Sequence, residues 1–167
     1  MSFTELSKER FSVRQFNPDK PVEKEKLDAI LEQVLIAPTA ANMQPQLVKV
    51  LQTPEEIAKA DIISRCRYGA PLAFLICYDK SKTIKHSEFD AGIIDCSIVT
   101  THMMLQAWEL GLGSVWCLAF DAAKAREELG LSENIVPVAF LPVGYAADGV
   151  EPHPFHTTTK PLEDLLI

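Results

Sequence analysis

The segment Arg10-Phe11-Ser12-Val13-Arg14 places two cations and a hydroxyl at alternate positions in an acidic sequence. In an extended chain, Arg10, Ser12 and Arg14 share one face, and Phe11 and Val13 share the other. Arginine donates paired hydrogen bonds to phosphate oxygens and stays charged, while serine and backbone N–H groups add donors. The pattern predicts a phosphate site with an apolar anchor. On these five residues alone, however, two solvated arginines in a surface turn are the better interpretation, because short basic patterns are common.

A second polar segment, residues 38–45, reads Pro-Thr-Ala-Ala-Asn-Met-Gln-Pro. Small residues let a flat ligand approach the backbone closely, and Asn42 and Gln44 each offer donors and an acceptor to the polar edge of a heterocycle. A helix C-cap followed by a turn accounts for the same composition equally well.

Other reactive residue types form no catalytic or metal-binding pattern, so we name no catalytic residue and predict no metal site. His153 and His156 lack a companion carboxylate or thiol cluster, and the prolines beside them prevent a helical pair. Arg65 and Arg67 fit an exposed helix end better than a ligand site. The cysteines show no C-x-x-C spacing and lie in or beside apolar runs, which predicts buried free thiols at Cys66, Cys77, Cys96 and Cys117.

The composition predicts one globular domain over residues 1–167. The chain has 16 basic and 23 acidic residues and a net charge of −7, which argues against nucleic acid or an anionic membrane as the main partner. Its first residues lack the basic start and apolar stretch of a signal peptide. The longest apolar region, 93–110, is interrupted by polar residues and is unsuited to span a membrane. Free thiols fit a reducing compartment, so we expect a cytoplasmic protein.

Helices and strands must position these segments, and the apolar periodicity and capping signals predict where they lie. Helices are expected over residues 4–9, 23–38, 54–65, 90–110 and 121–129. Strands are expected over residues 47–51, 72–78, 115–118 and 135–145. The strand 72–78 is an almost unbroken apolar run, which indicates burial on both faces. Pro137 and Pro142 predict irregular or edge-like pairing for the last strand.

Two further features suggest contact with a second subunit. The helix 90–110 is apolar on nearly every side, which places it in a core or across a subunit interface. The tail from Val150 contains three prolines and should be an extended arm before a last turn at 162–166.

The glycines of 111–114 end the helix, but they do not form a dinucleotide-binding fingerprint because a third glycine is absent.

Four segments, taken together and in order, resemble the nitroreductase family of FMN-dependent oxidoreductases. They are residues 10–14, 38–45, 111–114 and the terminal Lys-Pro-Leu-Glu-Asp of 160–164. The resemblance implies an α+β fold of three layers, α/β/α, with a mixed, mainly antiparallel sheet. It also implies an intertwined homodimer with FMN sites at the interface and a C-terminal arm, residues 150–167, crossing to the partner.

The resemblance also implies roles for individual residues. Arg10, the backbone at Phe11 and Ser12 would hold the FMN phosphate, with added charge from Lys160. Arg14 matches a family cation near either the phosphate or the flavin pyrimidine edge, and both alternatives stay open.

The flavin ring would be approached from the other subunit by the 38–45 segment, at Pro38, Thr39, Ala40, Asn42 and Gln44. Backbone N–H groups around Leu118 and Ala119 would face its N5/O4 side. The family usually has serine where Thr39 stands, and often a second basic residue where residues 157–159 are threonines.

The implied activity is hydride transfer from NADH or NADPH through flavin N5 to a flat electron-poor acceptor, a nitroaromatic or a quinone, by ping-pong turnover. A nearby cation such as Arg14 would stabilise the negative charge of the reduced flavin. The alternatives are a non-catalytic or redox-sensing FMN-binding protein, and a reductive dehalogenase or enone reductase on the same fold.

Overall fold

Four antiparallel strands form one sheet in the order β1-β2-β4-β3. The computed structural model describes residues 1–86 and 88–167. The strands are β1 (Gln46–Leu51), β2 (Leu72–Asp79), β3 (Gly113–Ser114) and β4 (Ile135–Gly144). Within the described residues, the one parallel pairing is an isolated bridge between Ser12 and Ser114. The predicted α+β class with a mainly antiparallel sheet is therefore confirmed.

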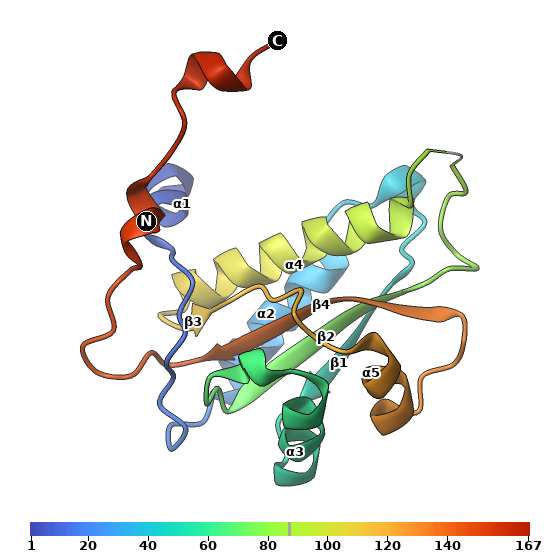
Figure 1. Cartoon of the computed structure of the whole chain (residues 1–167), viewed down its shortest axis with the longest axis horizontal. Coiled ribbons are helices and arrows are strands. Elements are labelled where there is room, and N and C mark those ends of the chain that lie inside the picture. Colours follow the sequence, from blue (N-terminus) through green and yellow to red (C-terminus); the bar gives the residue numbers. More distant parts are fainter. Residues whose placement is uncertain (87) are drawn as a thin grey trace.

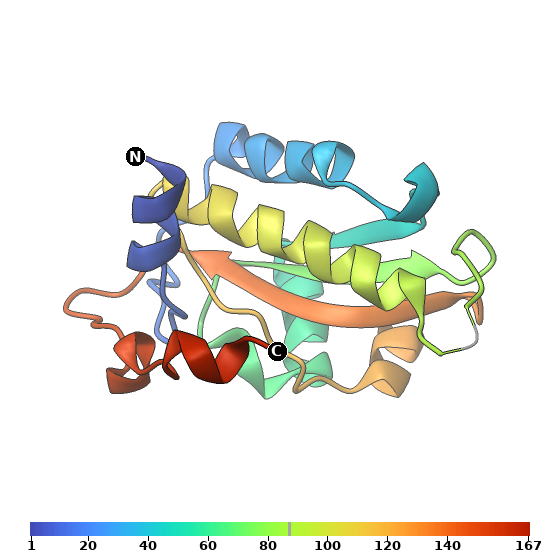
Figure 2. The same cartoon turned by 90° about the horizontal axis from the view of Figure 1, so that it is seen from above.

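Helices cover both faces of this sheet (Figures 1 and 2). They are α2 (Lys24–Ile36) and α4 (Ala91–Glu109) on one face, and α3 (Pro54–Ile63) and α5 (Ala122–Leu129) on the other. A further short helix, α1 (Phe3–Glu9), precedes the 10–14 segment and has no buried residue. The N-termini of α4 and α5 carry the expected side-chain caps, because the carboxyl groups of Asp90 and Asp121 accept hydrogen bonds from the first turns of these helices, whereas α2 has no side-chain cap. The predicted helices are thus confirmed to within about two residues at most ends.

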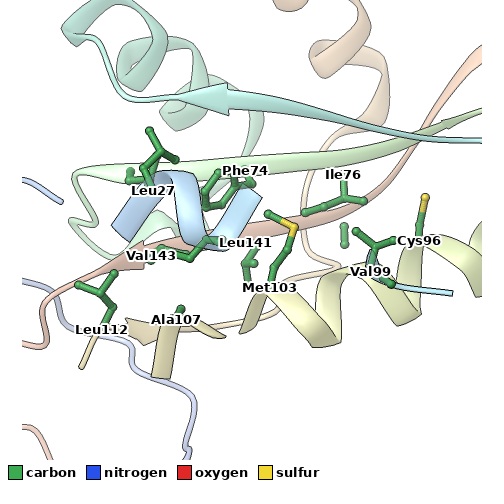
Figure 3. Packing of buried hydrophobic residues seen from close by; sticks show 14 of the residues in the cluster. Leu27, Phe74, Ile76, Cys96, Val99, Met103, Ala107, Leu112, Leu141 and Val143 are labelled. Carbon is green, nitrogen blue, oxygen red and sulfur yellow. The ribbon is translucent and has the colours of Figure 1, made fainter. Parts of the chain in front are cut away.

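Strand β2 divides the core in two, because its alternate side chains enter opposite layers. Phe74 and Ile76 pack with α2 and α4 in one cluster, which Figure 3 shows together with Met103 of α4. Leu75 and its odd-numbered neighbours pack with α3, α5 and Phe140 in the other. Every residue of β2 before its last is buried, as the unbroken apolar run predicts. This two-sided burial produces the three-layer arrangement.

The strand predicted over 115–118 is wrong in position. The paired residues are Gly113 and Ser114, and after them only Cys117 pairs, in an isolated bridge to Phe140 of β4. The interruption has a cause in the partner strand. The Val115 N–H donates to the carbonyl of Pro142 at 3.3 Å, but proline has no N–H with which to continue the ladder.

The irregular pairing predicted for β4 is confirmed, whereas its edge-like position is wrong. The register shifts between Ile76 and Cys77 of β2, opposite Pro137 and Ala139, so the proline lies beside a bulge. The strand nevertheless lies between β2 and β3. Prolines are tolerated in this inner strand because Pro137 lies at the bulge and Pro142 lies just past the two residues that pair with β3.

The C-terminal tail leaves the sheet, passes α1 and projects away from the domain (Figure 1). Two short 3-10 turns, Pro154–Thr157 and Leu162–Leu165, interrupt an otherwise extended path. The second corresponds to the predicted last turn, and the first was not predicted. Within the described part of the chain, no helix combines the length and the apolar character needed to cross a bilayer.

Replacing Gly113 with alanine should destabilise the fold, because an added Cβ would lie 2.5 Å from Cγ2 of the buried Val13 side chain. We expect a loss of about 1 to 3 kcal/mol in the free energy of unfolding, the usual scale of overpacking. Urea unfolding followed by circular dichroism measures it. Gly149→Asn is the control, since that glycine faces open space and asparagine tolerates its positive φ. Equal stabilities of the two variants would contradict the packing described here.

Candidate binding site for a phosphate and a flat heterocycle

The polar face of the 10–14 segment lines a cavity of about 550 Å³. Arg10, Ser12 and Arg14 all line it. Arg10 is half-buried, and this burial lowers the pKa of its guanidinium, which still remains protonated in any working buffer. Two cations and a hydroxyl around one hollow form an environment suited to a dianionic group such as a phosphate.

The apolar face of the 10–14 segment, Phe11 and Val13, anchors it to the domain, as the sequence predicts. Val13 is fully buried, and its N–H donates to the Ser114 carbonyl at 3.0 Å. The Phe11 ring meets Trp108 of α4 edge to face, with ring centroids 5.1 Å apart. At the start of the segment, the Arg10 N–H donates to the carbonyl of Leu6, so that α1 leads directly into the cavity.

Three residues of the C-terminal tail also line the cavity: His153, Phe155 and His156. Nε2 of His156 lies 2.9 Å from the carbonyl oxygen of Lys8, and its ring is edge-on to Phe11. In the sequence, these histidines are candidates for metal ligation alone. The described residues hold no cluster suited to a metal ion. No local signal links them to residues almost 150 positions earlier.

The 38–45 segment contains a tight turn, as one of its two sequence interpretations predicts, and most of its residues are exposed. A 3-10 turn, Ala40–Asn42, follows α2, and the Gln44 N–H donates to Oγ1 of Thr39 at 3.1 Å. Pro38, Asn42 and Gln44 are exposed, whereas Thr39 and Ala40 are half-buried.

This turn is strained. Ala41, Asn42 and Gln44 have φ values of 47°, 55° and 50°, in the left-handed region that residues other than glycine and asparagine rarely adopt. One hydrogen bond ties the turn to α4, from the Ala40 N–H to Oδ1 of the buried Asp95 at 2.8 Å. Such strain persists only where the surroundings enforce it and is common at ligand sites.

Leu118 and Ala119 lie on an open stretch after the Cys117 bridge. The Leu118 side chain is 72% exposed, and the Ala119 carbonyl accepts a hydrogen bond from Oγ of Ser64 at 2.8 Å. Across residues 1–86 and 88–167, the N–H groups of Leu118 and Ala119 have no hydrogen-bond partner. They are therefore available to a ligand acceptor.

In the described part of the chain, the residues that line the cavity include none of the 38–45 turn and neither Leu118 nor Ala119. Phe11 fixes the cavity at the C-terminal end of α4 through Trp108, whereas Asp95 fixes the turn near the N-terminal end of the same helix. Thirteen residues of helix separate the two contacts by about 20 Å. Lys160 is exposed on the tail and does not line the cavity.

One face of α4 is uncovered. Ile93 and Ile94 are nearly half exposed, and with Trp116 they line a groove of about 390 Å³. Nε1 of Trp116 is buried without a hydrogen-bond partner among the described residues. The helix thus has one face in the core and a second, largely apolar face left open.

The remaining candidates have structural roles. Arg67 forms a paired salt bridge with Asp61, in which Nε lies 2.6 Å from Oδ1, and therefore has a structural role. All four cysteines are free, as predicted, although Cys66 is half-buried rather than buried. Burial raises the pKa of Cys77 and Cys117 to about 12, which suppresses the thiolate and with it nucleophilic reactivity.

Known proteins with this architecture agree on one family. A crystal structure of a nitroreductase family protein from Clostridium difficile 630 is 42% identical, with a TM-score of 0.92, over 100% of this chain and 98% of that one. An FMN-dependent nitroreductase from Clostridium difficile R20291 is 28% identical, with a TM-score of 0.76, over 95% of this chain and 98% of its own.

A protein of Archaeoglobus fulgidus, provisionally named an NADH dehydrogenase/NAD(P)H nitroreductase, is 32% identical over 146 residues, which cover 83% of this chain and 82% of the relative. The sequence profile of the nitroreductase family matches residues 7–68 and 61–145. The chain therefore belongs to the nitroreductase family of oxidoreductases.

Proposed function

We propose that the protein is an FMN-dependent NAD(P)H oxidoreductase whose phosphate site is the cavity at Arg10, Ser12 and Arg14. The observation that carries the proposal is the convergence of two cations and a hydroxyl on one hollow of about 550 Å³. This donor set fits the phosphate of FMN, and the named C. difficile R20291 relative is FMN-dependent.

When bound, FMN supplies two-electron chemistry, accepting hydride from a nicotinamide and passing it to a second substrate. The chain's own residues bind and orient it. The unpartnered N–H groups of Leu118 and Ala119 suit acceptor atoms on the ring edge. Arg14, exposed at the mouth of the cavity, offers positive charge either to the phosphate or to the electron-rich ring.

The complete site is formed by two subunits. Because the contact of the cavity with Trp108 and that of the 38–45 turn with Asp95 lie about 20 Å apart along α4, we infer that a second copy supplies the turn to each FMN. The uncovered face of α4 at Ile93 and Ile94 is the surface on which that copy packs. The exposed tail with Lys160 then crosses to the partner.

The second substrate is a flat electron-poor compound, a nitroaromatic or a quinone, that takes the place of the nicotinamide in ping-pong turnover. No cysteine serves as a nucleophile in this scheme, in keeping with the raised pKa of Cys77 and Cys117. A protein that only stores or senses FMN would have the same phosphate site, so reduction by a nicotinamide separates the two functions.

The purified protein should show flavin absorbance bands that bleach when NADH or NADPH is added without oxygen, because hydride transfer removes the oxidised chromophore. A quinone or a nitroaromatic added afterwards should restore the colour. Flavin bands that persist with both nicotinamides would favour the binding protein. A colourless protein that takes up no added FMN would overturn the proposed site.

Arg10→Ala should weaken FMN binding by about 1.5 to 3 kcal/mol, the scale of a lost charge-assisted hydrogen bond, or roughly 10- to 150-fold in Kd. Flavin fluorescence titration measures the change. Riboflavin, which lacks the phosphate, should bind both proteins equally. Lys8→Ala removes a nearby cation outside the cavity and should leave FMN affinity unchanged. Equal FMN affinity of Arg10→Ala and the parent would refute the phosphate assignment.

Ile94→Glu should convert the dimer to a monomer and abolish FMN binding together, because a charge on the uncovered face of α4 opposes its burial. Light scattering after size-exclusion chromatography reports the mass, and absorbance reports the cofactor. Ile62→Glu is the matched control, since Ile62 is equally exposed but lies on α3. A monomeric Ile94→Glu variant that keeps FMN would show that one chain forms the whole site.

A further inference from the structure

Asp95 is a buried acidic residue, and only one of its two carboxyl oxygens has a hydrogen-bond partner among the described residues. Its side chain is 1% exposed, on the part of α4 that faces the 38–45 turn. Oδ1 accepts the Ala40 N–H at 2.8 Å, whereas Oδ2 is buried with no hydrogen-bond partner among residues 1–86 and 88–167. We propose that Asp95 is a positioning residue for the FMN site, holding the turn with one oxygen and receiving a ligand donor with the other.

The first half of this role follows from how the turn is held. The other hydrogen bonds of residues 39–44 in the described structure join the turn to itself, from Asn42, Met43 and Gln44 back to Thr39, Ala40 and Asn42. Among residues 39–44, only the bond to Asp95 reaches another element, whereas the end of the segment is held by the Asp79 N–H of β2, which donates to the Pro45 carbonyl at 2.9 Å. A turn with strained φ values at Ala41 and Gln44 needs such a fixed point to keep one conformation.

The second half follows from the unpartnered oxygen. A buried acceptor without a partner costs folding free energy, and an apolar side chain would avoid that cost. The helix supplies a direct contrast five residues later, where the buried Thr100 hydroxyl donates to the Cys96 carbonyl and is satisfied. A buried carboxyl oxygen without a partner beside a strained turn indicates a donor that arrives with the ligand. The hydroxyl and ring N–H groups of FMN are donors of this kind.

This inference rests on the proposed function, and three variants test it in the full-length protein. Asp95→Ala removes both oxygens. Asp95→Asn keeps an acceptor for Ala40 but changes the second atom from acceptor to donor. Thr100→Val is the matched control, because it removes a buried polar group of the same helix whose hydrogen bond stays within α4. For each, FMN titration gives Kd, absorbance gives the spectrum of the bound flavin, and melting of the FMN-free protein gives Tm.

We expect Asp95→Ala to raise the Kd for FMN at least tenfold and to shift the absorbance of the flavin that remains bound. Its FMN-free Tm should stay close to that of Thr100→Val, because each variant removes one hydrogen bond of a buried side chain of α4. Asp95→Asn should have a Kd between those of the parent and the alanine variant. Thr100→Val should keep the parental Kd and spectrum.

Two results overturn the proposal while leaving the proposed function intact. One is a parent that binds FMN and an Asp95→Ala variant with the same Kd and spectrum. The other is an FMN-free Asp95→Ala variant that melts well below both the parent and Thr100→Val, which would assign Asp95 to the stability of the fold. A parent that takes up no FMN is a different outcome, because it removes the proposed function and this inference with it.

Discussion

Burial of β2 on both faces is the constraint from which the rest of the structure follows. A strand whose side chains all avoid water must be covered by a layer on each side, so α2 and α4 close one face and α3 and α5 the other. The sheet inside these layers needs β4 beside β2, even though β4 carries two prolines. The bulge and the short β3 are the local adjustments that make this possible.

Local patterns predict most of this architecture, because capping residues and apolar periodicity act over a few positions. Asp90 and Asp121 mark helix starts from sequence alone, and the run 72–78 indicates a doubly buried strand. The misplaced strand at 115–118 has a nonlocal cause. Its apolar residues favour a strand, but the missing N–H of Pro142, far along the chain, decides where pairing stops.

The candidate site was less accessible to sequence reasoning for the same reason. The alternation of Arg10, Ser12 and Arg14 predicts a shared face, and these side chains do line one cavity. The tail histidines reach that cavity through a contact that no spacing rule describes. In the sequence, Asp95 is only one of the polar residues that interrupt the apolar region 93–110, because the sequence reveals neither the bond to Ala40 nor the buried oxygen without a partner.

The contact between His156 and Lys8 has a consequence for how the protein is made. It joins the two ends of the chain, so the wall of the cavity cannot close until residue 156 has been synthesised and has left the ribosome. The sheet and its two cores involve only earlier residues and can form before then. The nascent chain can therefore form its core before its cavity is complete.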